Sequence, residues 1–278
     1  MQRFKVTIAY DGSGFHGFQR QADERLRTVQ GELETRLTKL LAEPIGIHAA
    51  GRTDAGVHAK GQVFHFDTER RITADGLLYA VNRYLPADLT ATAVAAVQPS
   101  FHARKHALGK CYSYHLYTGR RLPAIGHMYL AHEVQPVDCG RLAAVLAQAE
   151  GAHHFGGFCG RGATTLTYDR TLYRIRVLVR GDYVSVYLIG DGFLRKMVRN
   201  LVGTALDEAV GRKPAGLFAK ALASGKRTDG GNTAPAQGLF LETVYYSERD
   251  LTDGIARLEA AQPEGFAGPA AIFQQLFR

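Results

Sequence analysis

The segment from Thr171 to Ile189 restricts the fold of this 278-residue chain more than any other. Residues Thr171 to Arg180 and Tyr183 to Ile189 have the length and composition of strands, and only Gly181-Asp182 separates them. A two-residue connection of this kind joins antiparallel neighbours in a hairpin, whereas parallel neighbours need a crossover of a dozen residues or more. The chain is therefore expected to contain an antiparallel sheet.

The other periodic segments mix helices and strands without strict strand–helix–strand alternation. We therefore expect an α+β fold of two similar sub-domains, each with a mainly antiparallel sheet and helices. The expected boundaries are 1–105 and 106–247, followed by a helical tail over 248–278. The predicted strands are 3–10, 62–67, 89–97, 110–117, 171–180, 183–189 and 239–246, and the predicted helices are 29–41, 77–85, 139–150, 192–206 and 214–224.

Composition favours a globular cytoplasmic protein. The hydrophobic fraction of 46% and the charged fraction of 22% argue against disorder. No stretch approaches the roughly 18 consecutive apolar residues that a membrane span needs, and the N-terminus lacks the pattern of a secretory signal. The cysteines form no Cys-x-x-Cys pair, and neither His102/His106 nor His153-His154 with Cys159 has a carboxylate at a familiar ligand spacing. No metal site is expected.

The charge of the chain points to nucleic acid. Lys and Arg number 34 against 26 Asp and Glu, which gives a net charge of +8 and a pI near 9.4. Arginine outnumbers lysine 25 to 9, which favours bidentate contacts to phosphate. No acidic residue occurs from Leu89 to His132, a stretch that we interpret as a surface facing a polyanion. Its basic residues are Arg104, Lys105, Lys110, Arg120 and Arg121.

The stretch from Ala50 to Ala59 reads Ala-Gly-Arg-Thr-Asp-Ala-Gly-Val-His-Ala and is predicted to be a loop. Glycines on both sides of Asp54 permit positive φ angles and close approach of another part of the backbone. The alternative is an ordinary turn in which Asp54 bonds its own backbone and Arg52 is solvated. Taken alone, the pattern favours the turn.

Two further stretches combine basic and aromatic or apolar residues. Tyr112 and Tyr114 share one face of a predicted strand, where they either stack on unpaired bases or fill the core. In the predicted helix 192–206, the basic residues collect on the face opposite a broad apolar face. They are Arg195, Lys196 and Arg199, of which Arg199 borders the apolar face and is expected to point inward.

Five separated motifs resemble those of one family. They are Tyr10-Asp11-Gly12…Gly17-Phe18-Gln19, Thr28-Val29-Gln30, Gly51-Arg52-Thr53-Asp54-Ala55-Gly56-Val57-His58-Ala59, Phe193-Leu194…Met197-Val198-Arg199-Asn200-Leu201-Val202-Gly203 and Ala234-Pro235-Ala236-Gln237-Gly238-Leu239. In this order, over residues 3 to 246, they resemble the tRNA pseudouridine synthase A family. The resemblance reverses the preference for an ordinary turn at Asp54.

The resemblance implies a pseudo-symmetric pair of α+β sub-domains around a central basic cleft, in a homodimer without cofactor or metal. It implies isomerisation of uridine to pseudouridine at positions 38, 39 and 40 of the tRNA anticodon arm. Asp54 matches the catalytic aspartate and Arg52 the arginine of the same loop. Tyr112 matches the tyrosine that packs on the target base, and Arg199 matches the basic residue that pairs with the aspartate. The tail after about residue 247 has no match.

The sequence departs from the family pattern at two positions. His154 stands where the family's His-Asp-Phe motif has its aspartate, and Phe18 stands for the tryptophan of the early Gly-Trp-Gln motif. Neither belongs to the four proposed catalytic residues. The expected substrate-binding residues are Arg52, Arg104, Lys105, Lys110, Tyr112, Arg195 and Lys196.

The proposed chemistry suits these residues. An aspartate of ordinary pKa is ionised at pH 7 and supplies a nucleophile or an anionic stabiliser, and a base in a helical stem must be flipped out to reach it. Two alternatives remain. One is a non-catalytic RNA-binding protein, which has no need for Asp54 in a cationic cleft, and the other is a metal-dependent RNA hydrolase built on the histidines.

Overall fold

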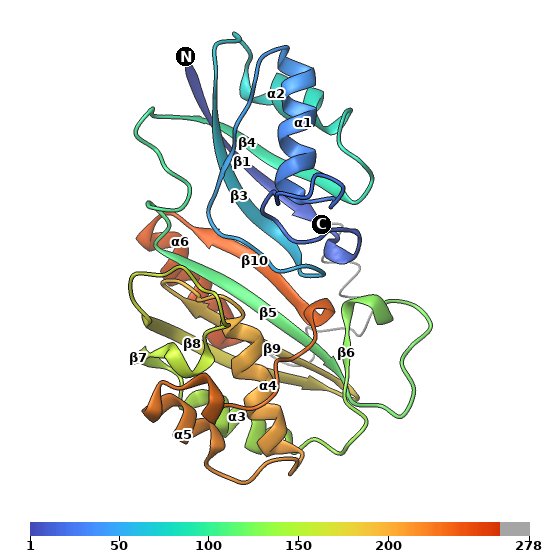
Figure 1. The fold of residues 1–278 in the computed structure, drawn as a ribbon, viewed down its shortest axis with the longest axis vertical. Coiled ribbons are helices and arrows are strands. Elements are labelled where there is room, and N and C mark those ends of the chain that lie inside the picture. The colour runs from blue at the N-terminus through green and yellow to red at the C-terminus, as the bar shows by residue number, and fades with distance from the viewer. Residues whose placement is uncertain (262–278) are drawn as a thin grey trace. The chain divides into compact units, whose positions relative to one another are not determined.

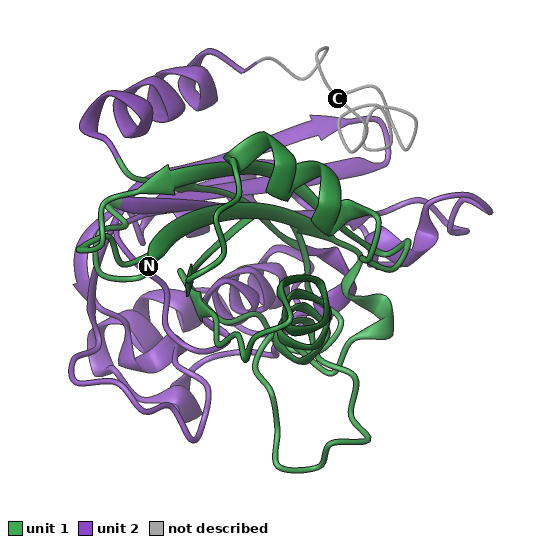
Figure 2. Cartoon of the chain, turned by 90° about the horizontal axis from the view of Figure 1, so that it is seen from above, with its two compact units in different colours: residues 1–108, 240–246 green, residues 109–239, 247–278 purple. Residues whose placement is uncertain are grey.

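The structure is a computed structural model that describes residues 1–261 and divides into two compact units. Unit 1 comprises residues 1–108 and 240–246, and unit 2 comprises residues 109–239 together with the chain from residue 247 (Figure 2). The chain thus leaves unit 1 after Leu108 and returns to it for the strand near residue 240. No helix within residues 1–261 has the length and apolar character to cross a membrane.

Unit 1 has a sheet with the strand order β4-β1-β3-β10, and β2 pairs with β3. All of these neighbours are antiparallel except β10 and β3, which are parallel (Figure 1). Thr28 caps the first helix by accepting a hydrogen bond from the N–H of Gly31, as its place before an apolar helical pattern predicts. The elements are β1 (Gln2–Tyr10), α1 (Val29–Leu41), β2 (His48–Ala49), β3 (His58–Thr68), α2 (Ala74–Asn82), β4 (Leu89–Val97) and β10 (Leu239–Tyr245).

Unit 2 has a sheet with the order β5-β9-β8-β7, in which every pair is antiparallel. Helix α6 lies on one face of this sheet and α3, α4 and α5 lie on the other (Figure 2). The elements are β5 (Gly109–Tyr117), β6 (Ala131–His132), α3 (Cys139–Ala147), β7 (Gly151–His154), β8 (Asp169–Arg180), β9 (Tyr183–Gly190), α4 (Met197–Ala209), α5 (Leu217–Ser224) and α6 (Glu248–Ala260).

The expected α+β class with mainly antiparallel sheets is confirmed. Strands β8 and β9 form the predicted hairpin, and Gly181 takes the positive φ of 54° that its turn requires. Helix α6 accounts for the first part of the predicted helical tail, and residues 262–278 lie outside the described residues.

The predicted helix 192–206 is wrong at both ends, because α4 runs from Met197 to Ala209. Lys196 immediately precedes it with a φ of 58°, a left-handed conformation that interrupts a helix. Arg195 and Lys196 therefore lie on the segment before the helix, and only Arg199 is helical. The predicted shared basic face of these three residues does not exist.

Candidate functional site

The loop that carries Asp54 joins β2 to β3 in unit 1 and is fixed by buried groups. Gln62, which is fully buried, donates from Nε2 to the carbonyl of Gly51 over 3.0 Å. The N–H of Phe18 donates to the carbonyl of Thr53 over 3.1 Å. The hydroxyls of Thr53 and Tyr10 share a buried hydrogen bond of 2.8 Å. The backbone before Asp54 therefore has little freedom.

Burial also keeps the Tyr10 phenol in its protonated form. It raises the pKa of Tyr10 to about 12, against smaller opposing contributions from the hydrogen bonds with Thr53 and Gln62. A neutral hydroxyl can both donate and accept, so the anchor between Tyr10 and Thr53 persists across the neutral pH range.

Two glycines of the motif at residues 10–19 lie against the backbone of the Asp54 loop. A Cβ atom at Gly12 would lie 2.1 Å from the carbonyl oxygen of Val57, which no side chain can accommodate. Gly17 has a φ of 94°, and a Cβ there would lie 3.1 Å from the carbonyl oxygen of Thr53. The segment from Tyr10 to Gln19 thus packs directly against the backbone of the Asp54 loop.

Asp54 itself begins a turn that its main chain closes. The N–H of Val57 donates to the Asp54 carbonyl over 3.2 Å, and Gly56 supplies a φ of 76°. The Asp54 side chain is half-buried, and Arg52 is exposed. Within residues 1–261 the Arg52 side chain makes no hydrogen bond or ion pair. The geometry is a carboxylate on an anchored loop with an exposed cation two residues away.

Tyr112 and Tyr114 lie on the same face of β5 in unit 2, as predicted, but they differ in environment. Tyr114 is fully buried, and its hydroxyl donates to the carbonyl of Pro235 over 2.9 Å. Tyr112 is 7% exposed and meets the ring of Phe193 edge to face, with centroids 4.9 Å apart. Both side chains are buried, so the core interpretation is confirmed for Tyr114 and also describes the burial of Tyr112.

Arg199 is the third residue of α4, and hydrogen bonds join it to the backbone of a segment that is distant in the sequence. Its Nε–H donates to the carbonyl of Ala234 over 2.7 Å, and the N–H of Ala234 donates back to the Arg199 carbonyl over 3.0 Å. The side chain is half-buried, as expected from its border position. Its positive charge acts on Tyr114 by lowering the pKa of that phenol, although burial has the larger effect and raises it.

The predicted catalytic residues are thus divided between the units. Arg52 and Asp54 share one loop of unit 1, and Tyr112 and Arg199 belong to unit 2.

A stripe of buried polar side chains on α4 was not predicted from the sequence. Asn200, Thr204 and Asp207 are each 0% exposed on a helix whose other buried side chains, apart from Glu208, are apolar. Their spacing of four and three residues places them on one face of the helix, and this spacing is the signal that was available.

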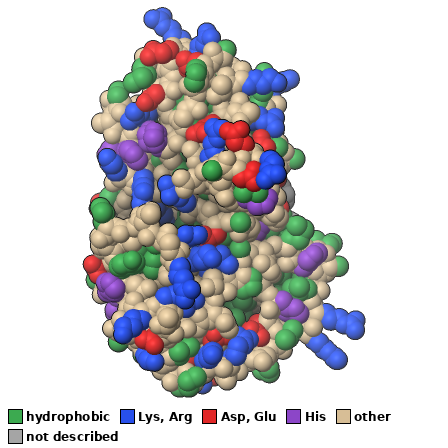
Figure 3. Space-filling model, viewed as in Figure 1, with side chains coloured by type: hydrophobic (Ala, Val, Ile, Leu, Met, Phe, Trp, Pro, Cys, Tyr) green, Lys and Arg blue, Asp and Glu red, His purple; other side chains and the backbone are tan. Residues whose placement is uncertain are grey.

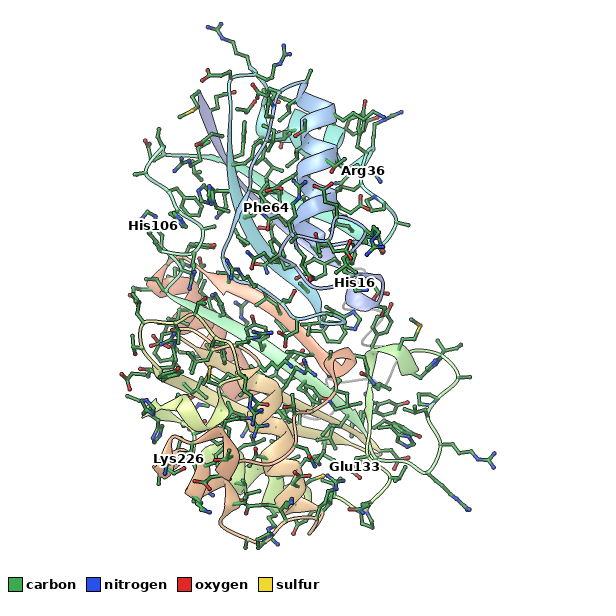
Figure 4. All side chains as sticks on the ribbon, in the orientation of Figure 1. His16, Arg36, Phe64, His106, Glu133 and Lys226 are labelled. Atoms are coloured by element: carbon green, nitrogen blue, oxygen red, sulfur yellow. The ribbon has the colours of Figure 1, made fainter. Side chains whose placement is uncertain are left out.

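The basic residues of the acid-free segment are spread out. Arg104 and Lys105 are exposed in unit 1, on the loop after β4 that also carries His106 (Figure 4). Lys110 lies at the start of β5, and Arg120 and Arg121 follow its far end. A strand of this length spans about 25 Å at 3.3 Å per residue. A ligand that contacts both ends of β5 must be at least this long. Figure 3 shows Lys and Arg side chains on the drawn face of both units.

No group of three or more His, Cys, Asp or Glu side chains within residues 1–261 is arranged to hold a metal ion. His154 instead packs against the ring of Tyr168, with centroids 5.5 Å apart. His65 stacks on His48 and meets His102 at a tilt, with ring centroids 5.1 Å and 4.8 Å away, and His48 also contacts His102. Its Nδ1 accepts the N–H of Ala103 over 3.2 Å.

This histidine cluster predicts a loss of stability in acid. Burial, followed by the charges of His102, His48 and Arg3, lowers the pKa of His65 from 6.5 to about 4. As the pH falls from 6.5 to 4, the unfolded chain gains a proton at His65 before the native chain does, so stability is full above pH 6.5 and declines below it. The difference corresponds to about 3 kcal/mol.

Urea unfolding at pH 7.5 and 4.5 measures this loss. Between these two pH values, the free energy of unfolding of His65→Gln is expected to fall by about 3 kcal/mol less than that of the wild type. The control variant His16→Gln, which replaces an exposed histidine, is expected to keep the pH dependence of the wild type. An unchanged pH dependence in His65→Gln would show that the cluster does not resist protonation.

Comparison with known proteins gives consistent matches over most of the chain. A family model described as tRNA pseudouridine synthase matches residues 6–104 and 145–247. A tRNA pseudouridine synthase A from Moorella thermoacetica is 40% identical over 246 residues, which cover 88% of this chain and all of the relative. Similar proteins from Desulfotalea psychrophila and Syntrophomonas wolfei are 38% and 37% identical, over 88% and 89% of this chain and 100% and 99% of their own lengths.

Proposed function

This chain belongs to the tRNA pseudouridine synthase family, and from that premise we propose that it isomerises uridine to pseudouridine at positions 38, 39 and 40 of the tRNA anticodon arm. It is an isomerase that acts on tRNA. The positions rest on the resemblance of the sequence motifs, and the observation that supports a catalytic role of Asp54 is its anchored loop. Three anchors, at Gly51, Thr53 and the turn to Val57, fix the backbone on both sides of a half-buried carboxylate.

In the proposed reaction the Asp54 carboxylate is the nucleophile and forms a transient bond to C1′ or to C6 of the uracil, which breaks again before the product leaves, so that Asp54 is regenerated. The bond between N1 and C1′ breaks, the uracil turns so that C5 faces C1′, and a C5–C1′ bond forms. The C5 proton is then lost, and N1 ends with a proton, so the reaction is an isomerisation without net gain or loss of atoms. A nucleophile held in place before the substrate arrives lowers the entropic part of the barrier, which is the advantage of the anchored loop.

Arg199 and Tyr112 complete the proposed site. Arg199 keeps Asp54 ionised and orients it, since an opposite charge at short range favours the charged carboxylate. Tyr112 covers the flipped uracil, and its contact with Phe193 holds the ring at a defined angle. Arg52 enters the space that the flipped base leaves or binds the adjacent phosphate, which its exposed position supports.

Binding of the tRNA body is proposed to be electrostatic. Arg104, Lys105, Lys110, Arg195 and Lys196 contact phosphates without reading bases, and a long RNA arm can span the length of β5. The proposal includes a cytoplasmic homodimer, in which the basic surface of one subunit supports the tRNA that the other modifies.

Pseudouridine mapping on unmodified tRNA transcripts tests the choice of site. Transcripts with uridine at only one of positions 38, 39 or 40 are each expected to gain pseudouridine there, and a matched transcript with cytidine at all three is expected to gain none. Modification that persists in the cytidine transcript would contradict the assignment to the anticodon arm.

A further inference from the structure

The buried polar stripe of α4 holds one segment of unit 2, residues 230–234. Thr204 Oγ1 accepts the N–H of Gly231 over 3.0 Å, and Asp207 Oδ2 accepts the N–H of Asn232 over 2.8 Å. Burying a polar group costs free energy unless the group makes hydrogen bonds, and an apolar side chain at the same place would not have this cost. The hydrogen bonds that the stripe makes to this segment therefore indicate that the position of the segment matters.

Asn200 is the member of the stripe nearest to Arg199. Its Oδ1 accepts the hydroxyl of Thr233 over 2.6 Å, and its Nδ2 donates to the carbonyl of Phe158 over 2.8 Å. Arg227 joins the same group, since its Nη2 lies 3.2 Å from Asn200 Oδ1 and 3.1 Å from Thr233 Oγ1. The Thr233 side chain is thus fixed from two sides.

The residue after Thr233 is Ala234, whose backbone holds Arg199 through both of its polar groups. The contact is close, because a Cβ at Gly203 would lie 2.8 Å from the Ala234 nitrogen and 2.1 Å from the Asn232 oxygen. The bond from Nε fixes one edge of the planar guanidinium, so the place of the Ala234 carbonyl determines the direction in which the rest of the group points.

We propose that Asn200, Thr233 and Arg227 are positioning residues for Arg199, because they fix the Ala234 carbonyl that orients its guanidinium. The inference rests on the proposed function, in which Arg199 orients Asp54. It assigns a role in the reaction to three side chains that do not touch the substrate.

The variant Thr233→Val tests this inference, because it keeps the shape of the side chain and removes the hydroxyl that Asn200 and Arg227 share. The single-turnover rate of pseudouridine formation at saturating tRNA is expected to fall about 10-fold, with unchanged tRNA affinity. The matched control is Glu208→Gln on the same helix. Glu208 is buried and accepts the N–H groups of Gly216 and Phe218 at the start of α5, so its loss lowers the melting temperature without changing the rate.

A double-mutant cycle separates positioning from a general structural role. If Thr233 acts through the Nε bond of Arg199, Thr233→Val should change the rate by less than about twofold in the Arg199→Lys background, where that bond is absent. A further 10-fold loss in that background, or a wild-type rate in Thr233→Val alone, would overturn the inference. A wild-type rate in Arg199→Lys alone contradicts the proposed role of Arg199. If Thr233→Val is slow while Arg199→Lys reacts at the wild-type rate, the positioning role of Thr233 is contradicted as well.

Discussion

Replacing Asp54 by asparagine is expected to lower the single-turnover rate of pseudouridine formation by about 10³-fold or more. The amide is nearly the same size as the carboxylate and is not a nucleophile, so the loop and its anchors should survive the change. The affinity for tRNA should stay the same or rise slightly, because the substitution removes a negative charge from a surface that binds a polyanion. A quenched reaction with excess enzyme measures the rate, and filter binding measures the affinity.

The matched control for this variant is Asp67→Asn. Asp67 is also a half-buried aspartate of unit 1, but it lies at the other end of β3 and is held by Arg3 through two hydrogen bonds of 2.7 and 2.6 Å. Its replacement should cost stability and leave the rate of the folded protein unchanged. A substantial turnover by purified Asp54→Asn would remove Asp54 from the mechanism.

Replacing Arg199 by lysine is expected to lower the same rate by roughly 10²-fold. Lysine keeps the positive charge, but it has neither the planar fork nor the Nε–H that donates to the Ala234 carbonyl. The loss should therefore lie in the chemical step, with tRNA affinity close to that of the wild type.

Arg195→Lys is the control for Arg199→Lys, since it makes the same change four residues earlier. Arg195 is exposed, and its guanidinium bonds the Gly162 carbonyl over 3.2 Å. Because the charge available to phosphate is retained, a near-wild-type rate is expected. Equal losses in both variants would mean that the guanidinium of Arg199 has no special geometric role.

Features set by neighbouring residues could be predicted from the sequence. Thr28 before the apolar pattern of Val29–Leu41 correctly placed the start of α1, and Gly181-Asp182 correctly placed the hairpin of β8 and β9. Each depends on a hydrogen bond or a turn within a few residues, which local composition encodes.

Features that depend on contacts with residues distant in the sequence could not be predicted from it. The pattern before α4 reads as helix, and the left-handed backbone of Lys196 that delays the helix depends on packing, including the bond from the N–H of Gly160 to the Arg195 carbonyl. The stripe of Asn200, Thr204 and Asp207 has meaning only beside a segment that begins more than twenty residues later. Two anchors of the Asp54 loop, Tyr10 in β1 and Phe18, likewise lie more than thirty residues before it in the sequence.

Release of tritium from C5 of uridine measures directly whether this chain converts uridine to pseudouridine in tRNA. Purified protein is incubated with an unmodified tRNA transcript labelled with tritium at C5 of uridine, in the presence of a metal chelator. Because C5 loses its hydrogen when the C5–C1′ bond forms, we expect release of one tritium per modified site from RNA of unchanged length. Binding of tRNA without release of tritium would instead indicate a non-catalytic RNA-binding protein. Cleavage of the RNA that requires added metal, without release of tritium, would indicate a metal-dependent hydrolase. Either result would contradict the conversion of uridine to pseudouridine by this chain.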